Sequence, residues 1–359
     1  MVEAEADVAR TLDSLFGTPN APKWPKALLD KLELESPVDF DNLKRAAGRI
    51  SSEQDGTHLG LFREHCVVCH GVAGSGAGPA SQFQDPYPRD FRHGVFKWKS
   101  TKRASKPTRE DLEKLLQHGV SGTGMPSFSL LASEDVDALV DYVIYLSIRG
   151  EVERRLLVRA VSDLDYGGEV APGDEHRLTY PASEAVEEVV EAAVKRVVKQ
   201  WVIAADEVVQ PTDQITRLSG DELRESIDRG KAWFHGPIAN CVGCHGVEGN
   251  GRVETLDYDD WTKEYTTRLG LTPTDQDSMQ PFRNLGALTP RPIVPRNLQV
   301  GVFRSGDDAS RLYRLITQGI SGTPMPGVLR VDEENGKGLT ETQVWDLVRY
   351  LQSFGSESL

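Results

Sequence analysis

Two five-residue stretches hold all four cysteines of the chain, and each combines two thiols with a histidine. They are Cys66-Val67-Val68-Cys69-His70 and Cys241-Val242-Gly243-Cys244-His245. Thiols three positions apart can reach the two vinyl groups of one porphyrin, and the histidine after the second thiol can point a ring nitrogen at the iron. The spacing therefore predicts two sites of covalent haem attachment and leaves no cysteine for a disulfide.

A C-x-x-C pair can also be a redox dithiol or half of a zinc site. Here a histidine follows both pairs, and each half of the chain also contains a turn-rich loop with a methionine. The loops span residues 119–126 and 319–326 and present Met125 and Met325. Histidine and methionine are both ligands of haem iron, so the haem interpretation is favoured over the dithiol and zinc interpretations.

Helical patterns surround the first attachment site. One helix is expected over residues 52–67, ending at the thiols. A second is expected over 108–118, where Thr108 has the spacing of an N-terminal cap. A third, capped by Ser133, is expected over 133–149, because its apolar residues recur on one face.

The second half of the chain repeats this order. Pro295-Arg296 matches Pro88-Arg89, the second methionine loop matches the first, and the last helix begins with Thr340 and Gln343 in capping-box spacing. Because the matching blocks recur in one order, the chain is predicted to contain two copies of one domain.

The charge of the chain restricts its partners. It has 41 Lys and Arg residues against 55 Asp and Glu residues, a net charge of −14. Such a field disfavours nucleic acid and anionic lipid, and it favours redox protein partners with a basic docking face.

The beginning of the chain conflicts with haem attachment. Residues 1–7 are acidic and lack the apolar core of a signal peptide. Haem is expected to be attached outside the cytoplasm, so we expect a periplasmic or other extracytoplasmic location and a signal or anchor that preceded this chain. No apolar run in the sequence approaches the length of a membrane-spanning helix.

Together these motifs resemble class I cytochrome c, here as a tandem diheme protein. The resemblance covers roughly residues 52–148 and 220–355. It implies a mainly α fold in which a first helix ends at C-x-x-C-H, a last helix crosses it and a loop supplies a methionine. It also implies that His70 and His245 are the proximal ligands of two haem c groups.

The same resemblance assigns the remaining ligands. Met125 and Met325 would be the distal ligands, and the carbonyl group of Pro79 would receive the imidazole proton of the first proximal histidine, an interaction that orients the ring and tunes the iron. In the second half Glu254 stands where that proline would be, which leaves the acceptor for His245 open.

Other side chains are candidates for the haem surroundings. His93 and His118 are alternative sixth ligands of the first haem, whereas Met279 lies in an insertion and is expected to pack in the protein interior. Arg89 and Arg296 are candidates to pair with haem propionates through their forked donors, or to form structural salt bridges.

We predict two cytochrome c-like helical domains joined by a helical linker. The domains span 52–150 and 218–359, preceded by an arm over 1–51 and separated by a linker over 151–217. The linker contains a helical pattern over 182–209, whose apolar stripe is expected to bury itself against the protein rather than dock a partner.

The functional hypothesis is a diheme electron carrier between respiratory partners, without catalytic residues. Imidazole and thioether ligation leaves no open position on the iron and raises its potential. Two alternatives remain: a diheme peroxidase-like enzyme with one open haem, and a haem-relay subunit of a larger oxidoreductase, which includes a membrane respiratory complex.

Overall fold

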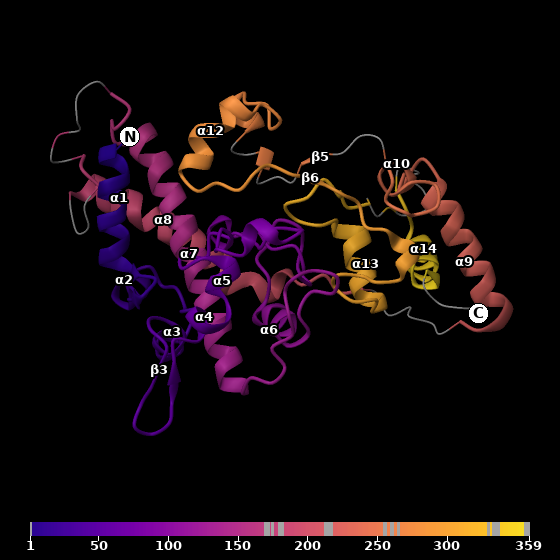
Figure 1. The fold of residues 1–359 in the computed structure, drawn as a ribbon, viewed down its shortest axis with the longest axis horizontal. Coiled ribbons are helices and arrows are strands. Elements are labelled where there is room, and N and C mark those ends of the chain that lie inside the picture. The colour runs from indigo at the N-terminus through magenta and orange to yellow at the C-terminus, as the bar shows by residue number, and fades with distance from the viewer. Residues whose placement is uncertain are drawn as a thin grey trace. The chain divides into compact units, whose positions relative to one another are not determined.

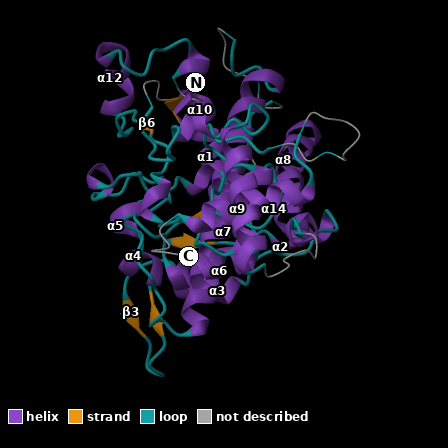
Figure 2. Ribbon diagram, turned by 90° about the vertical axis from the view of Figure 1, so that its right-hand side faces the viewer, coloured by secondary structure: helices purple, strands orange, loops and turns teal. Residues whose placement is uncertain are grey.

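In the computed structural model the chain is mainly α-helical, as predicted, with only short strands among the described residues (Figures 1 and 2). The structure describes residues 2–168, 173, 176–178, 183–211, 218–253, 257–258, 262–263, 266–328, 331 and 338–354. Within them, no helix is long and apolar enough to cross a membrane.

The chain divides into two compact units, and each is discontinuous in sequence. The first unit comprises Met1–Phe96, Lys106–Gly119 and Pro126–Asp206, and the second comprises Lys97–Ser105, Val120–Met125 and Glu207–Leu359.

The N-terminal arm consists of short amphipathic elements in the first unit. Its helices are α1 (Val2–Leu15), α2 (Lys26–Lys31) and α3 (Phe40–Ala46), and strands β1 (Gly17–Thr18) and β2 (Ala21–Pro22) pair antiparallel. Leu12 and Leu15 of α1 and Leu28 and Leu29 of α2 are buried.

The approach to the first attachment site differs from the predicted helix over 52–67. Strands β3 (Ser51–Ser52) and β4 (His58–Leu59) form a hairpin, and only α4 (Leu61–His65) and α5 (Val67–His70) are helical. Gly60 separates strand from helix with a φ of 81°, a left-handed conformation that glycine adopts without steric cost. The predicted helix over 52–67 was wrong because the spacing of apolar residues does not reveal the change of backbone direction at Gly60.

Two longer helices follow in the first unit. Helix α6 (Arg109–His118) begins with the predicted capping box of Thr108 and Asp111. Helix α7 (Ser133–Asp163) extends well beyond the predicted end at 149 because nothing breaks it, and its added turns bury further apolar side chains. Ala132, not Ser133, is its N-cap residue, and no side chain caps it.

The central helix α8 (Glu184–Val202) also belongs to the first unit and packs against α7. Its apolar stripe, including Val186, Val190 and Val197, is buried, as expected. A 3-10 turn, η3 (Ile203–Glu207), follows it. The other 3-10 turns of the first unit are η1 (Ser81–Phe83) and η2 (Phe91–His93).

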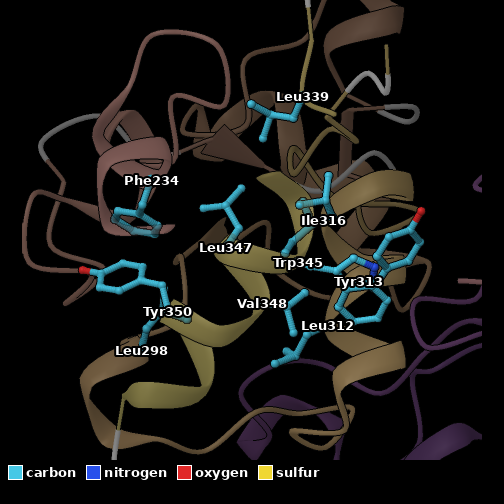
Figure 3. Packing of buried hydrophobic residues seen from close by; sticks show 11 residues of the cluster. Phe234, Leu298, Leu312, Tyr313, Ile316, Leu339, Trp345, Leu347, Val348 and Tyr350 are labelled. Carbon is cyan, nitrogen blue, oxygen red and sulfur yellow. The ribbon is translucent and has the colours of Figure 1, made fainter. Parts of the chain in front are cut away.

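The second unit is built on two crossing helices, α9 (Gly220–His235) and α14 (Glu341–Ser353). Gly230 allows the crossing, because a Cβ there would lie 2.1 Å from the carbonyl oxygen of Asp346. Helix α13 (Ala309–Gln318) completes the core. Figure 3 shows the cluster of buried side chains in this core, in which Tyr313 stacks on Trp345 with centroids 4.9 Å apart. The predicted capping box of Thr340 and Gln343 starts α14.

The remaining elements of the second unit are short. They are α10 (Val242–His245), β5 (Asp257–Tyr258), η4 (Thr267–Leu269), α12 (Gln276–Asn284), β6 (Pro292–Ile293) and η5 (Leu298–Val300). Strands β5 and β6 pair antiparallel, and α12 buries Met279, so that methionine packs in the interior as expected.

Candidate haem sites

The first attachment site is a single helical turn. The backbone amides of Cys69 and His70 both donate to the carbonyl group of Cys66, at 3.1 and 2.8 Å, which closes the turn and places the two thiols three positions apart on it. Burial raises the pKa of the Cys66 thiol to about 12. Reactive dithiols have lowered thiol pKa values, so this site does not have the character of a redox dithiol.

A backbone carbonyl group holds the imidazole of His70. Nδ1 lies 3.1 Å from the carbonyl oxygen of Arg89, and donation of its proton to that oxygen leaves Nε2 as the nitrogen for a metal. Burial lowers the pKa of His70, which favours the neutral imidazole that ligates metals.

This acceptor differs from the one that the resemblance implied. The carbonyl of Arg89, rather than that of Pro79, receives the imidazole proton. The segment around Pro79 is held elsewhere: the amides of Gly78 and Ala80 donate to the carbonyl groups of Cys69 and Val68, behind the attachment turn. Pro79 therefore lies between two residues that bond to the backbone of the attachment turn, and the resemblance assigned the wrong carbonyl group to His70.

An aromatic ring covers one face of the His70 imidazole. Phe91 stacks on the imidazole with centroids 4.5 Å apart and planes 17° apart. Its amide donates to the carbonyl oxygen of Gly74 at 2.8 Å, so the loop after the attachment turn positions this ring.

The second site repeats the turn and the carbonyl acceptor. The amide of His245 donates to the carbonyl group of Cys241 at 2.8 Å, and Nδ1 of His245 lies 3.3 Å from the carbonyl oxygen of Arg296. Burial raises the pKa of the Cys241 thiol to about 11 and lowers that of His245. Glu254 lies outside the described residues, and the question it left open is answered by Arg296.

The two methionine loops have the same internal hydrogen bonds. In the first, Val120 N donates to Met125 O (3.1 Å), and Met125 N donates to the hydroxyl group of Thr123 (3.1 Å). In the second, Ile320 N donates to Met325 O (3.2 Å), and Met325 N donates to the hydroxyl group of Thr323 (3.2 Å). The turn that presents each methionine is therefore one structure used twice.

The candidate histidine and methionine ligands are divided unequally between the two compact units. His245 and Met325 both belong to the second unit, whereas His70 belongs to the first and Met125 to the second. Methionine ligation of each haem stays a prediction.

The other candidate residues have partners of their own. His118 Nδ1 lies 2.9 Å from the carbonyl oxygen of Lys114, and His93 Nε2 lies 3.5 Å from Asp90. Arg296 Nε donates to the carbonyl group of Val302 at 3.0 Å. Pairing of Arg89 and Arg296 with propionates stays a prediction, and His93 and His118 stay alternative sixth ligands of the first haem.

The donor set fits haem c at both attachment sites. Each offers two cysteines outside any disulfide and an imidazole whose Nδ1 faces a carbonyl oxygen. Among the described residues, no three His, Cys, Asp or Glu side chains converge in a way that would hold a metal ion.

Two buried aspartates, one in the last helix of each half, were not predicted from the sequence. Asp141 in α7 accepts from Asn42 at 2.7 Å and from Arg109. Asp346 in α14 accepts from Arg229 at 2.9 Å and from Ser226. The signal was present, since D-x-V-x-Y-L occurs in both helices, but only the folded structure supplies the partners.

Comparison with known proteins places these sites in a wider context. The model of the cytochrome c family matches residues 60–147 and 227–355, more than half of the chain, with both attachment turns inside the matched ranges. A chain from the reducing HAO-like protein complex of Kuenenia stuttgartiensis is similar with a TM-score of 0.48 and 22% identity, over 85% of this chain and 99% of that chain. No curated protein matches the chain.

Proposed function

Since the chain belongs to the cytochrome c family, we propose that it is a diheme electron carrier of a respiratory chain. Cys66 and Cys69 would bind one haem c, and Cys241 and Cys244 the other. His70 and His245 would be the proximal ligands, with Met125 and Met325 as the distal ligands. The haems supply one-electron oxidation and reduction.

The observation that carries this proposal is the repetition of the proximal contact. Both histidines face the carbonyl oxygen of the arginine in a Pro-Arg pair, at 3.1 and 3.3 Å. A second-shell acceptor of this kind fixes the imidazole tautomer and its orientation, and raises its basicity. Both halves are therefore suited to the same type of iron ligation.

The two methionine loops support a carrier rather than an enzyme. Each loop presents a thioether from a turn that internal hydrogen bonds close. Those of the first loop are centred on Thr123, and those of the second on Thr323. A ligand presented in this way fills the sixth position and favours reduced iron. An enzyme that activates peroxide needs one position open.

A redox titration with optical spectra tests the carrier proposal directly. We expect two haems, both with the sulfur-to-iron charge-transfer band when oxidised, and slow binding of cyanide at each. Rapid cyanide binding at one haem of the native protein would replace the carrier with the peroxidase-like enzyme.

The acidic composition supports a partner with a basic docking face. The extracytoplasmic location of both is supported by membership of the cytochrome c family. Exposed charges are screened beyond about 10 Å at 0.1 M salt, so electron-transfer rates with such a partner should fall as ionic strength rises. A rate that is independent of salt, with co-purification of a larger oxidoreductase, would instead favour the haem-relay subunit.

A further inference from the structure

A short segment from the first half of the sequence belongs to the second compact unit. This segment, Lys97–Ser105, is called the strap here. Thr101 forms an antiparallel bridge with Val208, and the amide of Val209 donates to the carbonyl group of Ser100 at 2.9 Å. The amide of Lys102 also donates to the carbonyl group of Glu207, at 3.0 Å. The strap is thus held by backbone hydrogen bonds.

From the strap, Arg103 reaches the second methionine loop. One guanidinium nitrogen donates to the carbonyl oxygen of Met325 at 2.7 Å, and the other donates to that of Thr323 at 2.9 Å. In the opposite direction, the hydroxyl group of Ser321 donates to the carbonyl oxygen of Arg103 at 2.6 Å. Three hydrogen bonds therefore join one arginine to one loop.

The chemistry of the arginine suits this role. Its planar fork presents two donors in a fixed geometry, and hydrogen bonds from a charged donor are stronger than neutral ones. The loop also makes room for the side chain, because a Cβ at Gly319 would lie 2.6 Å from an Arg103 nitrogen. The φ of 66° at Gly319 separately requires glycine.

The strap is anchored a second time near the start of the loop. Arg314, in the helix α13 that leads into the loop, donates to the carbonyl group of Val209 at 2.8 Å. Val209 in turn is bonded to Ser100 of the strap. The strap and the helix before the loop are thus held by the same short stretch of chain.

The first methionine loop provides the internal comparison. Its own hydrogen bonds match those of the second loop, but Ser121 is exposed whereas Ser321 is buried. Thr323 is also buried, whereas its counterpart Thr123 is half-buried. The first loop also meets an arginine, since a Cβ at Gly122 would lie 2.6 Å from a guanidinium nitrogen of Arg296. The loops therefore differ in how deeply this serine and threonine are buried, which is greater in the second loop.

We propose that Arg103 is a positioning residue for Met325, and that through it the strap holds the sulfur of this methionine on the second haem. The inference rests on the proposed function, since it takes Met325 as the distal ligand. Without Arg103, the carbonyl oxygen of Met325 keeps the hydrogen bond from Ile320 and no other from the part of the chain that the structure describes. The loop then opens more often and the iron loses its sulfur ligand more often.

The test is cyanide binding and redox titration of the oxidised diheme protein with Arg103→Ala. Loss of hydrogen bonds from a charged donor is expected to increase the rate of cyanide binding at the second haem about tenfold. That factor corresponds to about 1.4 kcal/mol of loop opening. The potential of the second haem should fall and its sulfur-to-iron band should weaken, while the first haem keeps its values.

Two further variants separate positioning from folding. Arg103→Lys keeps a cationic donor without the fork and should recover part of the cyanide protection. Ser321→Ala removes one hydrogen bond to the strap and should give a smaller increase in the same rate. This milder variant serves if Arg103→Ala fails to fold.

Lys102→Ala is the matched control. Its side chain pairs with Glu207 at 3.0 Å, so its loss perturbs the strap without touching the loop. It should leave the potential and cyanide rate of the second haem unchanged. An equal effect of Lys102→Ala and Arg103→Ala would assign the strap a general structural role and overturn the inference.

The failure of this inference is distinguishable from the failure of the proposed function. If Met325→Leu removes the band but Arg103→Ala changes neither the potential nor the cyanide rate, the positioning role is wrong and the carrier stands. If Met325→Leu itself has no effect on the band, the ligand assignment fails first.

Discussion

The two attachment turns are alike, but the chain arrives at them in different ways. The first follows the β3–β4 hairpin and the five-residue helix α4, whereas the second follows the 16-residue helix α9. In the second unit α9 crosses α14 and packs against it, whereas in the first unit α7 contacts α3 more extensively than it contacts α4. A local turn can therefore be preserved while the helix that leads into it is replaced.

The surroundings of His70 and His245 show a second difference. Gly74 and Gly249 occupy equivalent positions, and each is covered by one phenylalanine and one leucine. At Gly74 these are Phe91 and Leu146, and at Gly249 they are Leu298 and Phe354. The aromatic ring has changed places: Phe91 stacks on His70, whereas the ring of Phe234 lies 6.4 Å from that of His245 and is tilted by 50°.

This exchange teaches how the two copies tolerate divergence. A swap that conserves the total volume keeps a core packed, since cores accept changes that preserve volume and pattern. The proximal carbonyl contact does not depend on which side chain supplies the ring, because it is made by the backbone of Arg89 or Arg296. The contact proposed to orient each histidine toward haem is therefore unchanged when the side chains around it differ between the two copies.

The largest expected effect comes from removing one attachment site at a time. Cys66→Ala with Cys69→Ala should eliminate one haem completely, because no thioether can form, and should leave the second unit folded with its haem. Intact mass and a pyridine haemochrome assay measure the number of haems. The reciprocal change at Cys241 and Cys244 should remove the other haem, and a protein that starts with one haem or none contradicts the proposal.

A smaller but more specific effect is expected from Met125→Leu and Met325→Leu. Leucine nearly conserves volume, so a methionine that only fills space should lose less than about 1.5 kcal/mol of unfolding free energy. If the methionine is an iron ligand, its replacement should also abolish the sulfur-to-iron band, lower the potential of that haem and allow cyanide to bind its iron. Spectra and redox titration of each variant decide. If Met125→Leu is silent, His93 and His118 become the candidates at the first haem.

The smallest expected effect tests the exchange of aromatic rings between the two sites. Phe91→Leu removes the ring stacked on His70 and should cost about 1 kcal/mol beyond the loss of buried area, measured by denaturant unfolding of the first unit. Leu298→Phe should also destabilise, by about 1–3 kcal/mol through overpacking, because Phe354 already covers Gly249. A Leu298→Phe protein as stable as the native one would show that the two sites are not packed as exchanged copies.

Much of the local structure was predictable from the sequence. The capping boxes at Thr108 and Thr340 were found because they need only residues three positions apart, and the buried stripe of α8 followed from its period. The hairpin before the first site was missed, since it depends on the left-handed Gly60 and on pairing across Ser51 and Leu59. Periodicity carries little information about either.

The sequence by itself determined the two C-x-x-C-H turns, the order of the repeated blocks and the mainly α class, because each depends on contacts within a few residues or on a repeated pattern. Only the tertiary structure decided that the carbonyl groups of Arg89 and Arg296 receive the imidazole protons, and that Arg103 holds the loop of Met325. Backbone carbonyl groups are present at every residue and carry no signature in the sequence. Which of them meets a given donor is set by how distant segments pack.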